Sequence, residues 1–306
     1  MPAAVSGPRI IGPEVEPRLD WLALTDALIA GHRLPRAEVA DSFLYRGEDT
    51  LLTRSAWIDG LGLAVKPASV FPGNPAQGLP MVNGAVNLLD DATGRLLAIV
   101  DFHLVTRWKT AGDSLLSARL LARKDARRVL VIGAGNVAAS MVAAYRTLIP
   151  EAEVTIWNRT RSAAEALAAR VGATVADELG AAVRAAEVIA TTTMSREPLL
   201  RGAWLSPGTH VDLIGAYRPD MREADDEALR RARVFVDSRA TTLGHIGEIQ
   251  DPVDRGVITP NDIVADFYDI ASGAYARRSE DEITLAKNGG GAHLDLMTAR
   301  WILDAA

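Results

Sequence analysis

One short run, Arg128–Ala138, constrains the fold more than any other part of the chain. Its sequence, RVLVIGAGNVA, joins an apolar segment typical of a buried parallel strand to a Gly-x-Gly-x-x-Ala turn, and a helix-like segment, 139–148, follows. In such a unit the first glycine, Gly133, permits a tight turn, and the second, Gly135, lets the backbone approach a pyrophosphate at the helix N-terminus. A glycine-rich turn also joins strands and helices that bind nothing. The flanking strand and helix favour a dinucleotide-binding turn.

The segment after the next predicted strand bears on which dinucleotide binds. Asn158 follows an apolar stretch, 154–157, and stands about 20 residues beyond Gly135, where NAD-dependent enzymes usually place a carboxylate on the ribose 2′-hydroxyl. A carboxylate would repel a 2′-phosphate, whereas an amide with neighbouring arginines would attract it. The alternative is a solvated basic turn. We expect NADP(H) to be favoured over NAD(H), with contacts from the glycine turn and this loop: Gly133, Gly135, Asn136, Val137, Asn158, Arg159, Thr160 and Arg161.

Composition excludes several other classes of protein. The 306 residues exceed what one compact core usually holds, so two domains are expected. A net charge of −6 without a long basic block argues against a nucleic-acid surface. The chain has no cysteine, and no histidine or carboxylate cluster has metal-ligand spacing, so no metal is expected. There is neither a signal-peptide pattern nor an apolar run of membrane length, so we expect a cytoplasmic protein without a membrane partner.

The order of predicted elements indicates one domain inserted into another. From residue 128 onward, apolar strands alternate with helical segments, which is typical of a doubly wound parallel sheet of the Rossmann type. Earlier apolar runs are separated by turn sequences, which predict mostly antiparallel hairpins, and a last helix is expected over 292–303. The predicted class is therefore α/β, with a Rossmann-type domain, 108–284, inserted into a smaller α+β substrate domain, 1–107 and 285–306.

Two further predicted strands end in small or polar residues. The segments 187–193 and 210–215 are apolar runs of this kind. Because ligands of open α/β sheets bind at the carboxyl ends of the strands, these ends are expected to contact the ribose and nicotinamide. The residues concerned are Thr192, Thr193, Met194, Ile214 and Gly215.

Five motifs, in the same order along the chain, resemble the ornithine cyclodeaminase/mu-crystallin family. They are Gly62–Lys66 with Val70–Pro75, Lys109–Ser114, Gly133–Ala138 with Asn158–Thr160, Gly215–Glu223 and Asp281–Gly290. The resemblance implies that Asn288 and Gly290 complete the cofactor site from the C-terminal segment. It also implies a homodimer paired through the N-terminal sheets.

The resemblance places a set of cations around the substrate. It implies that Lys66 is the catalytic lysine, which holds the substrate carboxylate as an ammonium or gives a proton to the substrate nitrogen. Lys109, beside Thr110, stands where the family has an arginine and keeps the charge without the bidentate fork. The family's early arginine, on the first strands, has no clear counterpart in this chain. Arg54 stands where relatives are apolar, and whether Arg54 or Lys109 replaces the family's substrate arginine stays open. The alternatives are a solvent-directed lysine and an ordinary salt bridge.

Tyr217 is a departure from the cyclodeaminase pattern. Cyclodeaminases have an aspartate two residues before the proline of this loop, and here that position is Tyr217. A phenol, with an ordinary pKa of about 10, is a poor base at neutral pH, so cyclodeaminase activity is disfavoured and Tyr217 is assigned to substrate binding.

The resemblance therefore implies an NADPH-dependent reductase of small cyclic 2-imino carboxylates. Its substrates would be Δ1-pyrroline-2-carboxylate and Δ1-piperideine-2-carboxylate, reduced to proline and pipecolate. Three alternatives remain open at this point. They are an NAD-dependent ornithine cyclodeaminase, a reductase of acyclic imino acids or amino-acid dehydrogenase, and a non-catalytic NADPH-dependent ligand-binding protein.

Overall fold

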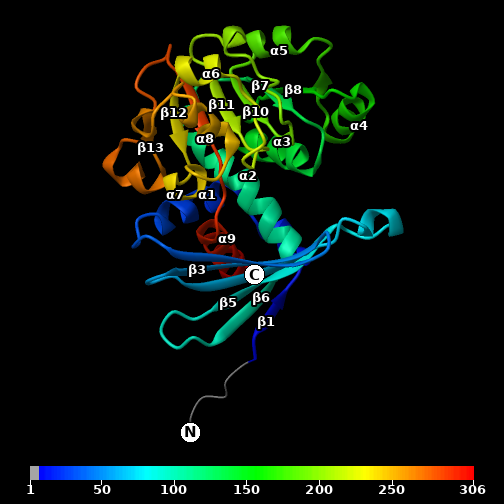
Figure 1. Cartoon of the computed structure of the whole chain (residues 1–306), viewed down its shortest axis with the longest axis vertical. Helices are drawn as coiled ribbons and strands as arrows, with labels where there is room; N and C mark the ends of the chain where they lie inside the picture. Colours follow the sequence, from blue (N-terminus) through cyan, green and yellow to red (C-terminus); the bar gives the residue numbers. More distant parts are fainter. Residues whose placement is uncertain (1–6) are drawn as a thin grey trace. The chain divides into compact units, whose positions relative to one another are not determined.

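The chain divides into two compact units, coloured along the sequence in Figure 1. Unit 1 comprises Met1–Lys109 and Gly291–Ala306, and unit 2 comprises Thr110–Gly290. The computed structural model describes residues 7–306. The predicted boundary at residue 285 would cut through strand β14 (Ile283–Lys287). Because β14 pairs with strands on both of its sides in unit 2, the segment up to Gly290 belongs to that unit.

Unit 1 is built on a six-stranded sheet with the order β1-β6-β5-β4-β3-β2. Neighbouring strands from β2 to β6 are antiparallel, whereas β1 pairs in parallel with β6. The strands are β1 (Arg9–Ile11), β2 (Glu38–Arg46), β3 (Asp49–Ile58), β4 (Gly62–Val70), β5 (Val82–Leu89) and β6 (Leu96–Asp101).

The helices of unit 1 cover one side of this sheet. Helix α9 (Ala292–Ala305), red in Figure 1, packs on β3 and β4 and against α1 (Trp21–Gly31). Asp20 caps α1 by accepting a hydrogen bond from the Ala23 amide at 2.8 Å, a contact typical of an aspartate at a helix start. Helix α2 (Phe102–Leu121) begins in unit 1 and continues into unit 2. Two short 3-10 helices complete the unit: η1 (Pro13–Arg18) and η2 (Asn74–Gln77).

Unit 2 is built on an eight-stranded sheet with the order β13-β12-β14-β11-β10-β7-β8-β9. Every neighbouring pair is parallel. The remaining strands are β7 (Arg128–Ile132), β8 (Glu153–Trp157), β9 (Thr174–Val175), β10 (Val188–Thr191), β11 (His210–Leu213), β12 (Ala232–Val236) and β13 (Ile263–Ala265). This sheet, together with the mixed sheet of unit 1, confirms the predicted fold class.

Helices connect the strands of unit 2. They are α3 (Asn136–Leu148), α4 (Arg161–Val171), α5 (Leu179–Ala185), α6 (Asp226–Arg231), α7 (Arg239–Thr242) and α8 (Gly247–Asp254), with the 3-10 helices η3 (Gly202–Trp204), η4 (Pro260–Asp262) and η5 (Phe267–Ser272). One apolar cluster joins the sheet to α5, α6 and α8 through buried side chains such as Ile189, Val183 and Leu229. Four of the five residues of β7 are buried, as is typical of a parallel strand that is covered on both faces.

The strand order reverses between β7 and β10. The chain runs from β7 outward to β8 and β9 and then returns to form β10 on the other side of β7. Such a topological switch point leaves a crevice at the carboxyl ends of the two strands, where open α/β sheets bind ligands. The fold therefore brings the Gly133 turn after β7 beside Thr192 after β10.

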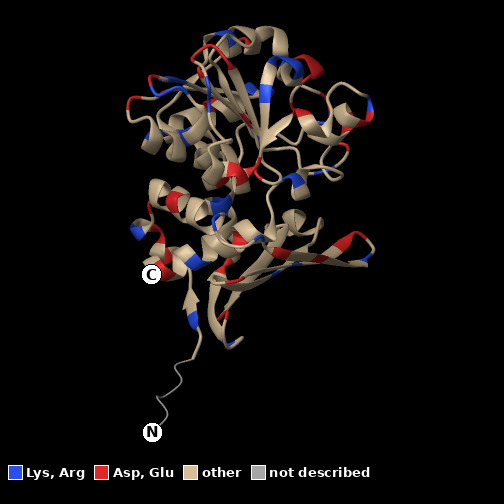
Figure 2. Cartoon of the chain, turned by 90° about the vertical axis from the view of Figure 1, so that its left-hand side faces the viewer, with Lys and Arg blue, Asp and Glu red and all other residues tan. Residues whose placement is uncertain are grey.

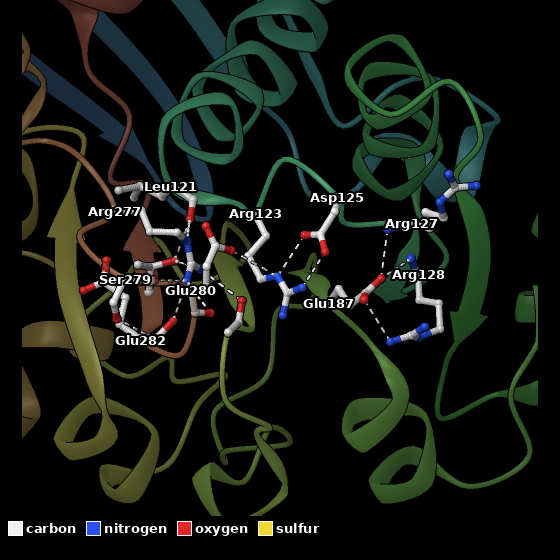
Figure 3. Close-up of polar contacts among 12 residues, drawn as sticks. Leu121, Arg123, Asp125, Arg127, Arg128, Glu187, Arg277, Ser279, Glu280 and Glu282 are labelled. Carbon is white, nitrogen blue, oxygen red and sulfur yellow. Dashed lines mark hydrogen bonds and ion pairs between the residues drawn. The ribbon is translucent and has the colours of Figure 1, made fainter.

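A network of paired charges lies at the amino ends of strands in this sheet, opposite the carboxyl ends that form the crevice (Figure 3). Glu187 accepts hydrogen bonds from the Arg127 and Arg128 amides at 2.8 and 2.9 Å. Arg277 donates to the carbonyl oxygens of Leu121 and Glu282 at 2.6 and 2.7 Å. These arginines and carboxylates thus pair with one another and with the backbone around the strand starts.

Charges elsewhere are distributed over the surfaces of both units. Figure 2 shows lysines and arginines interspersed with aspartates and glutamates. In the part of the chain that the structure describes, no helix combines the length and apolar character needed to span a membrane.

Candidate functional site

Three charged side chains form a row across the sheet of unit 1. Asp41 on β2 lies opposite Arg54 on β3, and Arg54 lies opposite Lys66 on β4. Directly opposite residues of antiparallel strands share one face of the sheet, so the three side chains project together. Arg54 binds Asp41 through Nε, at 3.1 Å from both carboxylate oxygens, and through Nη2 at 3.0 Å. Arg54 is therefore neutralised within the sheet.

Lys66 is nearly buried and held from two helices. Its Nζ donates hydrogen bonds to Asp295 Oδ1 on α9 at 2.8 Å and to Thr106 Oγ1 on α2 at 2.9 Å, and it lies 4.6 Å from the centre of the Phe102 ring. Burial lowers the pKa of Lys66, while the negative charge of Asp295 opposes that shift. Two of the three ammonium protons are thus engaged, and one donor remains for a ligand.

Asp295 is the functional candidate that sequence reasoning missed. It is 1% exposed, and its carboxylate is 229 positions from Lys66 in the chain. Burial disfavours its charged form, but Lys66, Lys109 and Arg54 together hold the pKa of Asp295 below its ordinary value. The signal that could have found it is an aspartate between leucines in a predicted apolar helix, since a buried carboxylate requires a partner.

Lys109 differs from the other two cations. It lies half-buried on α2 and forms no ion pair among residues 7–306, whereas Arg54 and Lys66 each pair with a carboxylate. Burial lowers the pKa of the nearby His293 to about 3, so this imidazole is neutral at physiological pH. The cluster of Asp41, Arg54, Lys66, Lys109 and Asp295 thus carries one surplus positive charge, which suits one carboxylate of a ligand.

In unit 2, the glycine turn has the geometry that a dinucleotide requires. Gly133 has φ +124°, and a Cβ there would lie 2.2 Å from Thr192 Oγ1. A Cβ at Gly135 would meet nothing within 4 Å, so the absence of a side chain there is not explained by protein packing. The N-terminus of α3, formed by Asn136 and Val137, has no side-chain cap, so its first amides have no side-chain acceptor and suit a phosphate. These features fit a pyrophosphate.

The predicted 2′-phosphate loop brings four residues together at the end of β8, but they differ in their contacts. Asn158 Nδ2 donates to the Thr160 carbonyl oxygen at 3.0 Å, which tightens the loop. Arg161 is paired with Glu165 at 2.7 Å and also with Asp177. Arg159 forms no ion pair with any residue in the described part of the chain. Of the two arginines, Arg159 is the one available to an anion.

Two buried glutamates, which the sequence did not single out as site residues, position the strand ends beside the switch point. Glu223 accepts hydrogen bonds from the Thr193 amide and hydroxyl at 2.7 and 2.8 Å and from the Gly215 amide at 2.7 Å. Glu248 accepts from the amides of Glu223 and Ala224 at 2.6 and 3.0 Å. Burial and the neighbouring Glu223 raise the pKa of Glu248 to about 7. The expected cofactor residues Thr193 and Gly215 are therefore set by carboxylates behind them.

The C-terminal segment of unit 2 also reaches this edge. The Asn288 amide binds the Leu213 carbonyl oxygen at 3.1 Å, and the Gly290 amide binds Asp237 at 2.6 Å. Asn288 Nδ2 is buried without a hydrogen-bond partner among the described residues. Ile214 is buried, and Thr110 is half-buried at the start of unit 2.

Two predicted contacts are more exposed. Met194 and Tyr217 are 72% and 58% exposed within unit 2. Across the described residues, no group of three or more histidine and carboxylate side chains is arranged to hold a metal ion.

Comparison with known proteins identifies the family. Residues 57–306 match the ornithine cyclodeaminase/mu-crystallin family, and the chain belongs to it. Arg54 and Asp41 precede the matched region. The Δ1-pyrroline-2-carboxylate reductase of Paracoccus denitrificans is 52% identical over 292 residues, which cover 93% of this chain and 92% of that protein.

Two solved structures share the fold over nearly the whole chain. One is the Thermococcus litoralis Δ1-pyrroline-2-carboxylate reductase in complex with NADH and L-proline, with a TM-score of 0.87 and 26% identity, covering 97% of each chain. The other is an archaeal alanine dehydrogenase dimer with bound NAD, with a TM-score of 0.88 and 29% identity, covering 98% of this chain and 96% of that one.

The two glycines of the turn are expected to respond differently to substitution. Gly133→Ala should lower the free energy of unfolding by roughly 1–3 kcal/mol, because the new Cβ meets Thr192 and the positive φ is strained. Gly135→Ala should leave the melting temperature of the free protein unchanged. It should weaken binding of the nicotinamide cofactor about tenfold or more by crowding the pyrophosphate. Thermal unfolding and fluorescence titration with NADPH measure the two effects, and equal NADPH affinity in Gly135→Ala and wild type would contradict this assignment.

Proposed function

We propose that this protein is an NADPH-dependent reductase of small cyclic 2-imino carboxylates. The observation that carries the proposal is the buried Lys66–Asp295 pair beside a cation without a carboxylate partner, in a chain that also contains a dinucleotide-binding turn. The 52% identity to a Δ1-pyrroline-2-carboxylate reductase supports the same substrate class. The products would be proline from the five-membered ring and pipecolate from the six-membered ring.

The charges of unit 1 suit such a substrate. Lys109, whose ammonium forms no ion pair in the described chain, would take the substrate carboxylate. Lys66, with one ammonium proton still available, would donate to the imine nitrogen and favour the protonated, more electrophilic form. The reduced nicotinamide, held by unit 2, supplies the hydride. The substrate is reduced at the imine carbon, the electron pair of the C=N bond moves to nitrogen, and one proton is consumed for each NADPH.

The preference for NADP(H) is part of this proposal. An arginine beside an amide at the end of β8 suits a 2′-phosphate, whereas a carboxylate at that place would repel it. The two solved relatives contain NADH and NAD, so a nicotinamide cofactor is common to them and the 2′-phosphate is the specific expectation for this chain.

We also propose a homodimer formed through unit 1. β2 is an edge strand of the sheet and exposes large apolar side chains, among them Phe43, Leu44 and Tyr45 at 49%, 68% and 72%. An exposed apolar edge of this kind is a pairing surface unless it is covered. The archaeal alanine dehydrogenase with the same fold is a dimer.

The direct test is NADPH oxidation, followed at 340 nm, with Δ1-pyrroline-2-carboxylate and Δ1-piperideine-2-carboxylate. We expect rapid turnover of at least one imine with NADPH and slower turnover with NADH, together with formation of proline or pipecolate. An enzyme that binds NADPH but reduces neither ring would refute the proposal. Turnover of the imine of pyruvate and ammonia in their place would indicate an acyclic amino-acid dehydrogenase.

Lys66 and Lys109 are expected to separate catalysis from binding. Lys66→Met should reduce kcat at least about 100-fold, because it removes the proton donor, while NADPH affinity is retained. Lys109→Met should chiefly raise KM for the imine by about tenfold, the loss of one charge-assisted hydrogen bond, with a smaller change in kcat. Steady-state kinetics and NADPH titration measure both variants. Normal kcat in Lys66→Met would exclude its role as proton donor.

The neighbouring arginines 159 and 161 provide a matched pair for cofactor choice. Arg159→Ala should raise the Kd for NADPH by about tenfold or more and leave that for NADH nearly unchanged, because only NADPH carries the 2′-phosphate. Arg161→Ala should change the NADPH affinity less, since Arg161 is already paired with Glu165 and Asp177. Equal effects of Arg159→Ala on both cofactors would contradict the assignment.

A further inference from the structure

The carboxylate of Asp295 is only half satisfied. Oδ1 accepts a hydrogen bond from Lys66 Nζ at 2.8 Å, whereas Oδ2 is buried and has no hydrogen-bond partner in residues 7–306. A buried carboxylate oxygen without a donor is costly, and native proteins keep few of them. This oxygen lies on the same carboxylate that binds the proposed catalytic lysine, so its missing partner is best sought in the substrate.

The chemistry of Asp295 defines the group that it can receive. The cations around it keep Asp295 ionised, and an ionised carboxylate accepts hydrogen bonds but donates none. The partner of Oδ2 must therefore be an N–H or O–H group, and a positively charged donor gives the stronger bond. His293 is kept neutral by its lowered pKa, so it does not provide that charge.

The charge balance of the cluster points to the same group. The three cations Arg54, Lys66 and Lys109 exceed the two carboxylates Asp41 and Asp295 by one, and the substrate carboxylate neutralises that excess. A protonated imine adds one further positive charge, on the atom next to the carbon that bears the carboxylate. Of the two carboxylates in the cluster, Asp41 is bound by Arg54 through both oxygens, and Asp295 has an oxygen still open.

We propose that Asp295 Oδ2 accepts a hydrogen bond from the protonated ring nitrogen of the substrate and thereby selects the iminium form. This inference rests on the proposed function and adds a second catalytic residue to it. The imine nitrogen, protonated through Lys66, keeps its N–H directed at Oδ2. When hydride adds to the imine carbon, the C=N electron pair becomes the lone pair of the amine nitrogen, and the N–H bond remains. Asp295 thus stabilises the reactive cation at pH values where the free imine is neutral.

The isosteric variant Asp295→Asn tests the charge and the acceptor together. Its pH profile of kcat/KM should lose activity at a lower pH than wild type, so that the loss is about 10- to 100-fold larger at alkaline than at acidic pH. Because Asp295 also raises the pKa of Lys66, a role through Lys66 alone would shift this profile too, and the ring-nitrogen preference tested below separates the two roles. Asp41→Asn is the matched control, because it removes the other carboxylate of the cluster, which binds Arg54 rather than Lys66: it should leave the alkaline limb in place.

A binding experiment on wild type separates this inference from the proposed function. Calorimetry with L-proline and tetrahydrofuran-2-carboxylate, in the presence of NADP+, compares a ring N–H with a ring oxygen. Wild type should prefer proline by about 10- to 100-fold, Asp41→Asn should keep that preference, and Asp295→Asn should lose it. NADPH titration of each variant verifies that the protein is folded.

The outcomes are distinct. If wild type reduces cyclic imines but binds both ring compounds equally, or if Asp295→Asn keeps the preference and the alkaline limb, the role of Asp295 is overturned and the reductase stands. If wild type reduces neither imine, the proposed function fails, and a proline preference that depends on Asp295 still supports recognition of a ring nitrogen. If wild type reduces neither imine and also binds neither compound, both the proposed function and the role of Asp295 are overturned.

Discussion

The buried ion pair between Lys66 and Asp295 organises unit 1. It joins the middle of the antiparallel sheet to the last helix of the chain, with Thr106 on α2 as the second acceptor. Both charges are withdrawn from water, so removing either partner leaves an uncompensated buried charge, a change that typically costs about 3–5 kcal/mol. The intact pair adds little net stability, since well-packed apolar residues of similar volume would stabilise the same contact about as well. The nearby cations Arg54 and Lys109 favour a role for the pair in chemistry rather than in stability.

Unit 2 uses buried charge differently. Glu223 and Glu248 meet backbone amides rather than ligands, and they hold the ends of β10 and β11 in the shape that the expected cofactor residues need. The turn after β7 depends instead on its two glycines. Gly133 adopts a positive φ, and the small size of Gly135 leaves open space. Burial and the neighbouring Glu223 raise the pKa of Glu248, and its two hydrogen bonds from backbone amides oppose that shift.

The three cations of unit 1 show why sequence reasoning could propose residues but not rank them. Arg54, Lys66 and Lys109 all bear positive charge, and the family resemblance alone left open whether Arg54 or Lys109 replaces the missing arginine. The antiparallel register places Asp41 opposite Arg54 and so occupies it, while Lys109 on α2 forms no ion pair in the described chain. The ranking depends on which carboxylates lie within reach, and pairing between distant segments decides that.

Local patterns determined the fold class, the parallel sheet of unit 2 and the position of its glycine turn, because a strand, a tight turn and a helix in succession are specified by neighbouring residues. The succession of elements also predicted that one domain is inserted into the other. Only the tertiary structure revealed Asp295 and Glu223 and placed β14 between β11 and β12. Each depends on contacts between residues far apart in the chain. The local sequence pattern does not predict such contacts, because the free energy that stabilises them comes from burial and charge pairing in the folded protein.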